Sequence, residues 1–332
     1  MPKVVVGFGP KQRARHFREE AQRILESFAT EIVYRESDEP WSEEEKARVL
    51  RDAEAYITGW GDGPLTERVI DAAQRLRIVA LVGSSVRHLC PEALFARGIH
   101  LTNTAKAVGD TVAEFTLGMI LAWCHLLPEW DRVTRAGGWR AEYRWPKWDL
   151  TGKTVGLIGC GAIGRRVVEL LAPFRCKILV ADPYLPDEVA AELGVEKVSL
   201  ERALSEPEII SVHAGSTEET YHMIGREQLD LIKDNAILIN TARGAIFDEQ
   251  ALAEKLNEGK IRAALDVFEE EPLPQDSPLR GLPNVLISPH LAAYSEEMLR
   301  RVGIAAAEDV KRFFEGKPPL NTVTPEMVKR MT

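Results

Sequence analysis

Three apolar segments in the second half of the chain run directly into residues that bind anions or exchange protons. Residues 236–240 continue into Thr241-Ala242-Arg243-Gly244, residues 262–267 run into the acidic stretch 269–271, and Ile287-Ser288-Pro289 is followed by His290. A parallel sheet presents its ligand-binding residues at the carboxyl ends of its strands. The pattern therefore predicts that these polar side chains share one edge of a sheet.

These residue types suit hydride transfer at C2 of a small 2-hydroxy or 2-oxo acid. An arginine can hold a carboxylate with two parallel hydrogen bonds, which a lysine does less well. A histidine can exchange a proton with the C2 oxygen near neutral pH, and a neighbouring carboxylate orients the ring and stabilises its charged form. A nicotinamide cofactor would supply the hydride.

Each of these residues also has a structural interpretation. Arg243 could belong to an ion pair of the fold, and His290 could be a core histidine. The run Glu269-Glu270-Glu271 could be a solvated loop, and spacing alone does not choose among its three carboxylates. Asp248 is most simply the start of a helix.

The most specific local motif is Gly159-Cys160-Gly161-Ala162-Ile163-Gly164. It follows an apolar strand at 155–158 and opens an amphipathic helix, as a dinucleotide-binding loop requires. Gly159 permits the tight turn, Gly161 lets the backbone approach a pyrophosphate, and Gly164 lets the helix pack closely on the strand. The free amides at the helix start would face the anion.

Asp182 ends the next strand and would accept hydrogen bonds from the adenosine ribose. Its charge would repel the 2′-phosphate of NADP, so the predicted cofactor is NAD. The structural alternative is a glycine turn that only packs a helix, with Asp182 capping a strand before Pro183. Cys160 is interpreted as a small side chain in the loop, because no basic residue adjoins it.

Short apolar runs alternate with amphipathic helical stretches, which is typical of α/β domains with parallel sheets. The predicted strands form two sets: Val4–Phe8, Glu31–Tyr34, Ala55–Thr58, Ile78–Gly83 and His100–Asn103, then Thr154–Ile158, Lys177–Ala181, Ile209–His213, Ala236–Asn240, Arg262–Val267 and Val285–Ser288. A long helical segment, Thr111 to Ala136, and a tryptophan-rich connection, Trp139 to Trp148, separate the sets. Ser42 and Glu45 predict a capping box at the start of a helix.

Length, charge and composition argue against several classes of function. The 332 residues carry a net charge of −9, which argues against a nucleic-acid surface, and two domains are expected at this length. No apolar run approaches the length of a membrane span, and the N-terminus is interpreted as a strand and not as a signal peptide. The four cysteines lack metal-ligand spacing, so reduced thiols in a cytoplasmic protein are expected.

The order of these segments resembles the D-isomer-specific 2-hydroxyacid dehydrogenases. The matching segments are Ala96-Arg97-Gly98-Ile99, Val112-Ala113-Glu114, the glycine loop, Asn240 to Gly244, Leu265-Asp266-Val267-Phe268 with Glu271-Pro272, and Ser288-Pro289-His290. The resemblance implies a flavodoxin-like substrate domain (residues 1–100 and 296–332) and an inserted Rossmann NAD domain (residues 101–295). It also implies a homodimer that the helix near Thr111 helps to form.

Residue roles follow from the same resemblance. It implies that Arg243 holds the substrate carboxylate, that Glu271 supports the imidazole and that His290 is the acid/base. Asp266 would bind the nicotinamide carboxamide. The backbone of Val82, Gly83 and Ser84 would face the substrate. The implied cofactor-binding residues are Gly159, Gly161, Ala162, Ile163, Gly164, Asp182, His213, Thr241, Ala242 and Asp266, with no metal.

The chain departs from the family at positions near the substrate. It has Ala162 where arginine is frequent, residues 83–88 in place of an Asp-containing turn, and Leu291-Ala292-Ala293 where a glycine-containing turn is commoner. These departures leave the side group of the substrate open. The cluster of Trp139, Trp145 and Trp148 could shape the substrate site, although core or interface packing is expected for at least two of the three.

Two other functions fit the same motifs. Corepressors that sense NAD(H) resemble this family and keep the arginine, glutamate and histidine, but the long extensions usual in them are missing here. A phosphite- or formate-type dehydrogenase would use the same scaffold. Formate dehydrogenases depart from the glutamate–histidine pair, so Glu271 argues against that enzyme.

Overall fold

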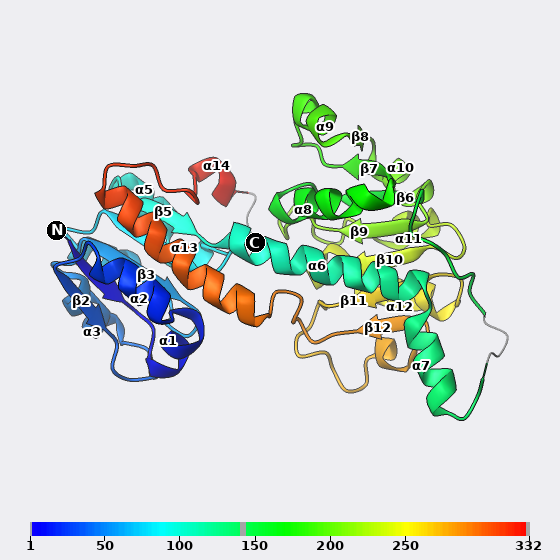
Figure 1. Cartoon of the computed structure of the whole chain (residues 1–332), viewed down its shortest axis with the longest axis horizontal. Helices are drawn as coiled ribbons and strands as arrows, with labels where there is room; N and C mark the ends of the chain where they lie inside the picture. The colour runs from blue at the N-terminus through cyan, green and yellow to red at the C-terminus, as the bar shows by residue number, and fades with distance from the viewer. Residues whose placement is uncertain (1, 140–143, 330–332) are drawn as a thin grey trace. The chain divides into compact units, whose positions relative to one another are not determined.

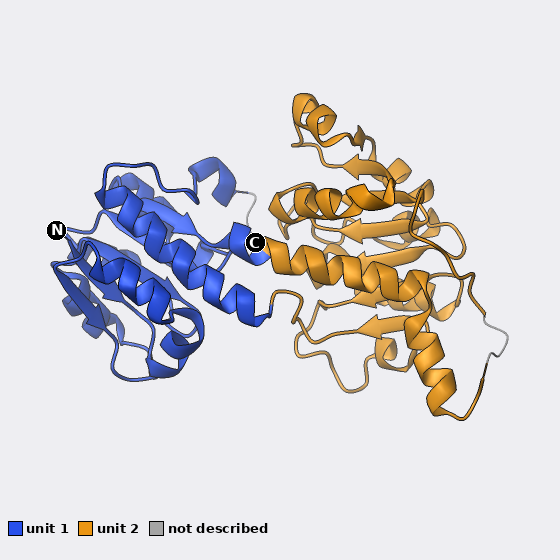
Figure 2. Cartoon of the chain, viewed as in Figure 1, with its two compact units in different colours: residues 1–108, 294–332 blue, residues 109–293 orange. Residues whose placement is uncertain are grey.

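The computed structural model describes residues 2–139 and 144–329. Within them the chain folds into two compact units, one made of residues 1–108 and 294–332 and the other of residues 109–293 (Figure 2). Both units are α/β structures with all-parallel sheets, which confirms the predicted fold class. Each unit is described by itself below.

The first unit has a five-stranded sheet in the order β2-β1-β3-β4-β5 (Figure 1). This order is that of flavodoxin-like folds. Its strands are β1 (Lys3–Val6), β2 (Glu31–Tyr34), β3 (Ala55–Gly59), β4 (Ile78–Val82) and β5 (His100–Asn103). Its helices are α1 (Pro10–His16), α2 (Glu19–Glu26), α3 (Glu43–Leu50), α4 (Glu67–Ala72), α5 (Pro91–Ala96), α13 (Glu296–Phe314) and α14 (Pro325–Val328).

The second unit has a seven-stranded sheet in the order β12-β11-β10-β9-β6-β7-β8, which contains the Rossmann order. Its strands are β6 (Thr154–Ile158), β7 (Lys177–Ala181), β8 (Glu196–Lys197), β9 (Ile209–Val212), β10 (Ile237–Asn240), β11 (Arg262–Leu265) and β12 (Val285–Ile287). Its helices are α7 (Leu127–Arg135), α8 (Ala162–Leu171), α9 (Asp187–Leu193), α10 (Leu200–Ser205), α11 (Arg226–Asp230) and α12 (Glu249–Asn257), together with most of α6 (Ala105–Cys124).

The central strands of both sheets are continuous apolar runs because helices cover both of their faces. In β10, Ile237 and Ile239 join the hydrophobic cluster that α6 and α8 complete. Leu238 points the other way, into the cluster that α11 and α12 complete. The alternation of side chains along one strand thus fills two cores, one on each face of the sheet.

The predicted elements need three corrections. Every predicted strand is present, but the short edge strand β8 was missed, and several predictions ran one or two residues past the carboxyl end of a strand. The predicted long helix is two helices, α6 and α7, because Leu126 has φ +56° between them. The capping box at Ser42 is present as predicted, with Ser42 and Glu45 bonding each other's backbone amide.

Helix α6 also corrects the statement that no segment is long and apolar enough to cross a membrane. By length and composition this helix of 20 residues passes that test, and half of its most apolar stretch is buried inside the molecule. A core helix of this composition passes the same test, so the finding is weak evidence for a membrane span.

The unit boundaries fall eight residues later and two residues earlier than the sequence placed them. β5 pairs with β4, so residues 100–103 belong to the first sheet. The first turn of α6 stays with that unit as well, and the second unit begins at Gly109 and ends at Ala293.

Two of the three tryptophans in the connection are packed against a buried arginine. The guanidinium of Arg262 lies 5.5 Å from the ring centre of Trp145 and 4.7 Å from that of Trp148. It also donates to the carbonyl of Trp123 at 3.0 Å. Trp139 is different, because 76% of its surface is exposed. Packing therefore explains Trp145 and Trp148 but not Trp139.

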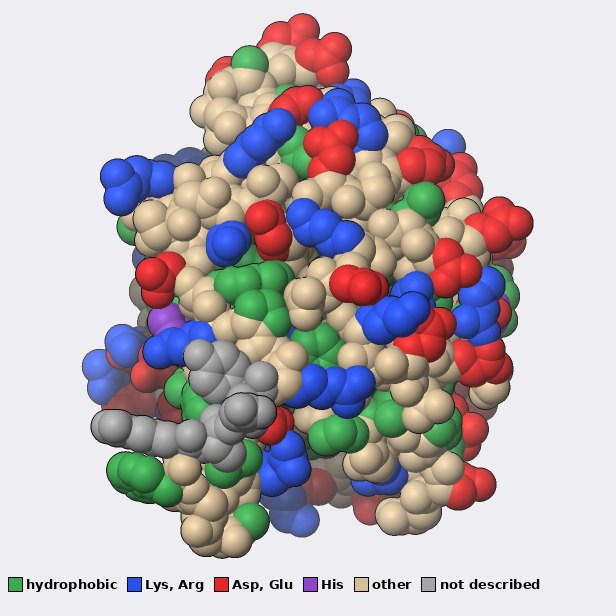
Figure 3. Space-filling view, turned by 90° about the vertical axis from the view of Figure 1, so that its right-hand side faces the viewer, with side chains coloured by type: hydrophobic (Ala, Val, Ile, Leu, Met, Phe, Trp, Pro, Cys, Tyr) green, Lys and Arg blue, Asp and Glu red, His purple; other side chains and the backbone are tan. Residues whose placement is uncertain are grey.

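Charged side chains of both signs are mixed on the surface. On the face shown in Figure 3, Lys and Arg lie beside Asp and Glu over most of the area, with hydrophobic side chains between them. Ion pairs along the helices include those of Arg202 with Glu206 and of Arg166 with Glu169. Exposed pairs of this kind contribute little to stability.

Candidate active site

The polar residues that follow the apolar strands of the second unit do meet at one edge of its sheet. In the sheet register Asn240 is level with Leu265, and Leu265 is level with Ile287. Because all three strands are parallel, Thr241, Asp266 and Ser288 leave the sheet side by side. The loops that carry Arg243, Glu271 and His290 therefore start from the same edge.

The glycine loop has the geometry that a dinucleotide requires. Gly159 has φ +90°, and a Cβ there would lie 2.6 Å from the amide nitrogen of Ala214. A Cβ on Gly164 would lie 2.6 Å from the carbonyl oxygen of Gly159, so α8 packs on the loop only without a side chain. Gly161 caps α8 and has open space where its Cβ would be, which leaves room for a pyrophosphate above the helix start.

Residues Ala162 and Ile163 form the first turn of α8, and Asp182 faces the loop from the end of β7. The carboxylate of Asp182 accepts hydrogen bonds from the amides of Cys160 and Tyr184, both at 2.8 Å. Asp182 is thus held beside the turn, where an adenosine ribose would meet it. Burial raises the pKa of the Cys160 thiol to about 11, so Cys160 stays protonated and unreactive at neutral pH.

The other residues predicted to bind the cofactor follow β9 and β10. His213 begins the loop after β9, and burial lowers its pKa to about 4, so its ring is neutral. Its Nε2 bonds the hydroxyl of Ser211 at 2.9 Å. The buried Thr241 shares a hydrogen bond of 2.9 Å with the hydroxyl of Thr116 in α6, and Ala242 follows it in the turn.

Arg243 is largely buried and has no ionic partner among the described residues. Burial lowers the pKa of its guanidinium, and the nearby charge of Glu271 opposes that shift. The hydrogen bond found for the guanidinium goes to the neighbouring carbonyl of Ala242 at 2.6 Å. Across residues 2–139 and 144–329, no carboxylate lies within ion-pair distance of it. A buried guanidinium with donors to spare is suited to bind an anion.

Glu271 and His290 form a pair. The imidazole Nδ1 of His290 lies 2.6 Å from Oε2 of Glu271, and Oε1 of Glu271 accepts the amide of Phe268 at 3.0 Å. The bond to Nδ1 leaves Nε2 to exchange a proton with a substrate. The side chain of His290 is 47% exposed, so it is not a core histidine.

Asp266 is buried among the donors of the turn that carries His290. Its Oδ1 accepts the hydroxyl of Ser288 at 2.5 Å and the amide of Leu291 at 2.9 Å, and its Oδ2 accepts the amide of Ala292 at 2.9 Å. Its own carbonyl accepts the amide of His290 at 2.8 Å. Asp266 therefore holds His290 in its left-handed conformation at φ +55°.

The structure separates the carboxylates between which the sequence could not choose. Glu269 bonds Nε2 of His222 at 2.8 Å and donates its amide to Glu249. Only Glu271, of the three in the run, bonds His290 in the part of the chain that the structure describes. Glu249 follows the N-cap Asp248 of α12, and burial together with the neighbouring carboxylates raises its pKa.

Two contacts that the sequence did not predict shape the Arg243 turn. Asn240 is buried and spans the turn, because its side chain accepts the amide of Ala242 and donates to the carbonyl of Arg243, both at 3.0 Å. A Cβ on Gly244 would lie 1.9 Å from the carbonyl carbon of Phe268, so the two loops touch backbone to backbone. A polar residue ending an apolar strand was a visible signal for Asn240.

In the first unit, Val82, Gly83 and Ser84 lie at the end of β4. The amide of Gly83 donates to the hydroxyl of Thr104 at 2.9 Å, and its carbonyl accepts the amide of Thr104 at 2.9 Å. Asn103 donates to the carbonyl of Ser84 at 2.8 Å. These bonds hold the segment against the end of β5.

Known proteins are similar to this chain both in sequence and in fold. Residues 117–292 match the family model described as the D-isomer specific 2-hydroxyacid dehydrogenase, NAD binding domain. A glyoxylate reductase of Korarchaeum cryptofilum is 39% identical over 285 residues, which cover 84% of this chain and 85% of that protein. A D-3-phosphoglycerate dehydrogenase of Methanocaldococcus jannaschii is 39% identical over 92% of this chain and 57% of its own length.

A solved structure agrees over nearly the whole chain. The phosphoglycerate oxidoreductase of Rhizobium etli superimposes with a TM-score of 0.82 at 29% identity, and the match covers 97% of this chain and 98% of that one. The similarity therefore includes both units and not only the cofactor-binding one.

Proposed function

We propose residue roles for this chain, which belongs to the D-isomer specific 2-hydroxyacid dehydrogenase family. It is an NAD-dependent enzyme that interconverts 2-hydroxy and 2-oxo acids, and the roles concern binding of the reactants and transfer of the proton. We propose a small D-2-hydroxy acid and its 2-oxo acid as the substrate pair, of the size of glyoxylate or hydroxypyruvate. The names of the similar glyoxylate reductases support that size.

NAD would be held by the glycine loop and the loops after β7, β9 and β10. The amides at the start of α8 would bind the pyrophosphate, and Asp182 would accept hydrogen bonds from the adenosine ribose. His213, Thr241 and Ala242 would line the path toward the nicotinamide, and Asp266 would reach its carboxamide. Bound in this way, NAD supplies or accepts the hydride at C2 of the substrate.

The guanidinium of Arg243 would bind the substrate carboxylate, and the backbone of Val82–Ser84 is the segment of the first unit that we propose for substrate binding. Arg243 has donors for which the described residues supply no partner, and its planar guanidinium matches the shape of a carboxylate. Since the Gly83 amide already donates to Thr104, the amide of Ser84 is the next donor along the segment.

His290 would act as the acid/base on the C2 oxygen. In reduction, Nε2 of the protonated ring gives its proton to the oxygen as hydride reaches the carbon, and in oxidation the neutral ring takes that proton back. Glu271 on Nδ1 fixes the orientation of the ring and stabilises its charged form.

The observation that carries this proposal is a largely buried arginine, with no carboxylate partner in the part of the chain that the structure describes, and an exposed glutamate–histidine pair at the same edge of the sheet. A panel of 2-oxo acids, including glyoxylate, hydroxypyruvate and 3-phosphohydroxypyruvate, should be assayed with NADH and with NADPH by the absorbance of the reduced cofactor. We expect turnover of at least one small oxo acid and a preference for NADH. A chain that binds NADH but reduces none of them would refute the proposal.

We also propose that the protein is a cytoplasmic homodimer, assembled through α6 and the segment that follows it. Leu127 and Trp139 are large apolar side chains with 57% and 76% of their surfaces exposed. Leu127 begins α7, the helix that follows α6, and Trp139 comes after the end of α7. Apolar groups exposed in this way are typical of an interface. Sedimentation equilibrium would test the stoichiometry, and Trp139→Ala should weaken the dimer.

A further inference from the structure

The loop after β3 carries a carboxylate that is completely buried. Asp62 accepts hydrogen bonds from the hydroxyl of Tyr56 and from that of Thr58, the latter at 2.5 Å, and both donors lie in β3. A Cβ on Gly7 would lie 2.3 Å from Oδ2 of Asp62, so only glycine fits there. The motifs of the catalytic chemistry do not include any of these residues.

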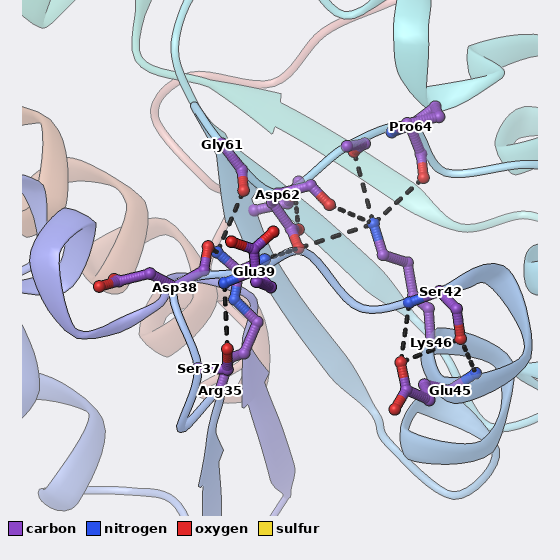
Figure 4. A network of polar contacts seen from close by, with 12 residues as sticks. Arg35, Ser37, Asp38, Glu39, Ser42, Glu45, Lys46, Gly61, Asp62 and Pro64 are labelled. Carbon is purple, nitrogen blue, oxygen red and sulfur yellow. Dashed lines mark hydrogen bonds and ion pairs between the residues drawn. The ribbon is translucent and has the colours of Figure 1, made fainter.

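Two buried cations flank this carboxylate. Nη1 of Arg35 lies 3.3 Å from Oδ1 of Asp62, and Nζ of Lys46 lies 3.6 Å from the same oxygen (Figure 4). Burial and the charge of Asp62 keep Tyr56 protonated, because both raise the pKa of its phenol. Replacing a buried ionic cluster by apolar side chains is often neutral or stabilising. Stability alone therefore gives little reason for this cluster.

Most of the other hydrogen bonds of the two cations go to the backbone of a single loop, although Nη2 of Arg35 also donates to the carbonyl of Asp38 at 3.4 Å. Lys46 Nζ donates to three successive carbonyls, those of Asp62, Gly63 and Pro64, at 2.7, 3.4 and 3.1 Å. Nη2 of Arg35 donates to the carbonyl of Gly61 at 3.0 Å (Figure 4). Residues 61–64 are thus held at four consecutive carbonyls by side chains from outside the loop.

This loop lies beside the segment proposed to receive the substrate carboxylate. Gly59 is level with Val82 in the sheet, so the loops after β3 and β4 leave it as neighbours. The amide of Leu65 then donates to the carbonyl of His88 at 3.0 Å. Desolvation and the charge of Lys46 lower the pKa of His88, and the charge of Asp62 opposes that shift.

We propose that Arg35, Lys46 and Asp62 form a positioning device for the substrate-binding segment 83–88. The cluster fixes residues 61–65, and these in turn support the segment from the side opposite to Asn103 and Thr104. The three residues are positioning residues, since they act through the loop. The inference rests on the proposed function, in which the backbone at 83–84 meets the substrate carboxylate.

Lys46→Met tests the proposal with the least disturbance of the fold. Methionine matches the length of the lysine stem, and its introduction leaves Arg35 and Asp62 as a neutral ion pair. The three carbonyls lose their donor, so the loop becomes less well fixed. We expect KM for the 2-oxo acid to rise about tenfold, because small misplacements of binding groups are costly. We expect kcat to fall less and NADH affinity, measured by fluorescence titration, to stay unchanged.

Lys3→Met is the matched control. Lys3 lies at the amino end of β1 in the same unit and pairs with Glu31 and Asp52. It should leave KM, kcat and NADH affinity as they are. If Lys46→Met fails to fold, Tyr56→Phe removes one bond to Asp62 without changing charge, and KM should rise in the same direction by less.

The outcomes separate this inference from the function on which it rests. A wild-type chain that reduces no 2-oxo acid with NADH would refute the proposed function. An active wild type with an unchanged KM in a folded Lys46→Met would refute the positioning role alone. Equal losses of oxo-acid and NADH affinity would also refute it, because they would show a general loss of structure.

Discussion

Among the described residues, Arg35 and Arg262 are fully buried and Arg243 is largely buried. The groups that accept their hydrogen bonds distinguish the three. Arg35 bonds Asp62 and two carbonyls, and Arg262 bonds two carbonyls and stacks on tryptophans. Arg243 donates to the carbonyl of its neighbour Ala242 and has no carboxylate partner among the described residues. Burying a cation is unfavourable unless it is paired, so Arg243 is the one of the three that is suited to bind an anion.

We expect Arg243→Lys to lower catalytic efficiency by about a hundredfold. Lysine keeps the charge but cannot bind a carboxylate at two points, and charge-assisted bonds of this kind contribute about 1.5–3 kcal/mol each. Steady-state kinetics would show the loss, while fluorescence titration should show nearly unchanged NADH binding. A parallel loss of NADH binding would indicate a structural or cofactor-binding role.

The Glu271–His290 pair makes a prediction about pH. Reduction needs the imidazole protonated and oxidation needs it neutral. Glu271→Gln removes the charge that stabilises the protonated ring, so the ring loses its proton at lower pH. We expect both pH–rate profiles to shift toward acid by about one pH unit. Reduction would then fall off earlier as the pH rises, and oxidation would reach its plateau at a lower pH.

His290→Gln and Glu269→Gln are the companion variants for this pair. Removing the acid/base should lower turnover by about a hundredfold or more. Glu269 bonds His222 and not His290, so Glu269→Gln should leave both pH profiles in place. If Glu269→Gln shifts the profiles and Glu271→Gln does not, the wrong carboxylate has been assigned.

At the scale of elements, a glycine at a helix contact allows two helices to pack closely. α2 and α13 lie side by side on the first unit (Figure 1). A Cβ on Gly303 of α13 would lie 2.2 Å from the carbonyl oxygen of His16, at the end of α1. The glycine therefore brings α13, which returns from the far end of the sequence, against the helices of the first ninety residues.

Gly303→Ala should destabilise the protein although alanine is the better helix former. Alanine gains about 1 kcal/mol of helix propensity, but overpacking a tight contact costs about 1–3 kcal/mol. We expect a lower Tm by calorimetry. Gly281→Ala, at a site with open space around the added carbon, should change it little. An unchanged Tm for Gly303→Ala would mean that α13 can shift away from α1.

At the scale of the whole molecule, each unit contains a histidine that is neutral because it is buried. Burial lowers the pKa of His16 and of His213 from 6.5 to about 4. Between these values the unfolded chain binds protons that the folded chain does not. The stability contributed by the neutral rings is therefore complete above pH 6.5 and is lost as the pH falls toward 4.

His16→Phe tests this acid sensitivity away from the proposed catalytic residues. Phenylalanine keeps an aromatic ring beside Phe8 and Trp60 but cannot bind a proton. The free energy of unfolding of the wild type should fall by about 1.4 kcal/mol per pH unit for each such histidine inside the window. Calorimetry between pH 7 and pH 5 should show a shallower fall for the variant, whereas equal slopes would contradict a neutral His16.

The sequence by itself determined every described strand except β8, the glycine loop and the residue types of the chemistry. Strands buried on both faces are continuous apolar runs, and the glycines at 159 and 164 are required by close backbone contacts, so both leave a local signal. The assignment of the chain to the 2-hydroxyacid dehydrogenases, which the comparisons confirm, also needed only short motifs in their order.

Tertiary structure decided what depends on contacts between distant segments. Spacing could not separate Glu269 from Glu271, because the choice depends on which carboxylate reaches His290 across 19 residues of chain. Neither the Asp62 cluster nor the three donors around Asp266 left a pattern in the sequence, since the donors come from separate elements. Local sequence fixes backbone conformation and burial, whereas the pairing of side chains is set only when the loops meet at the edge of a sheet.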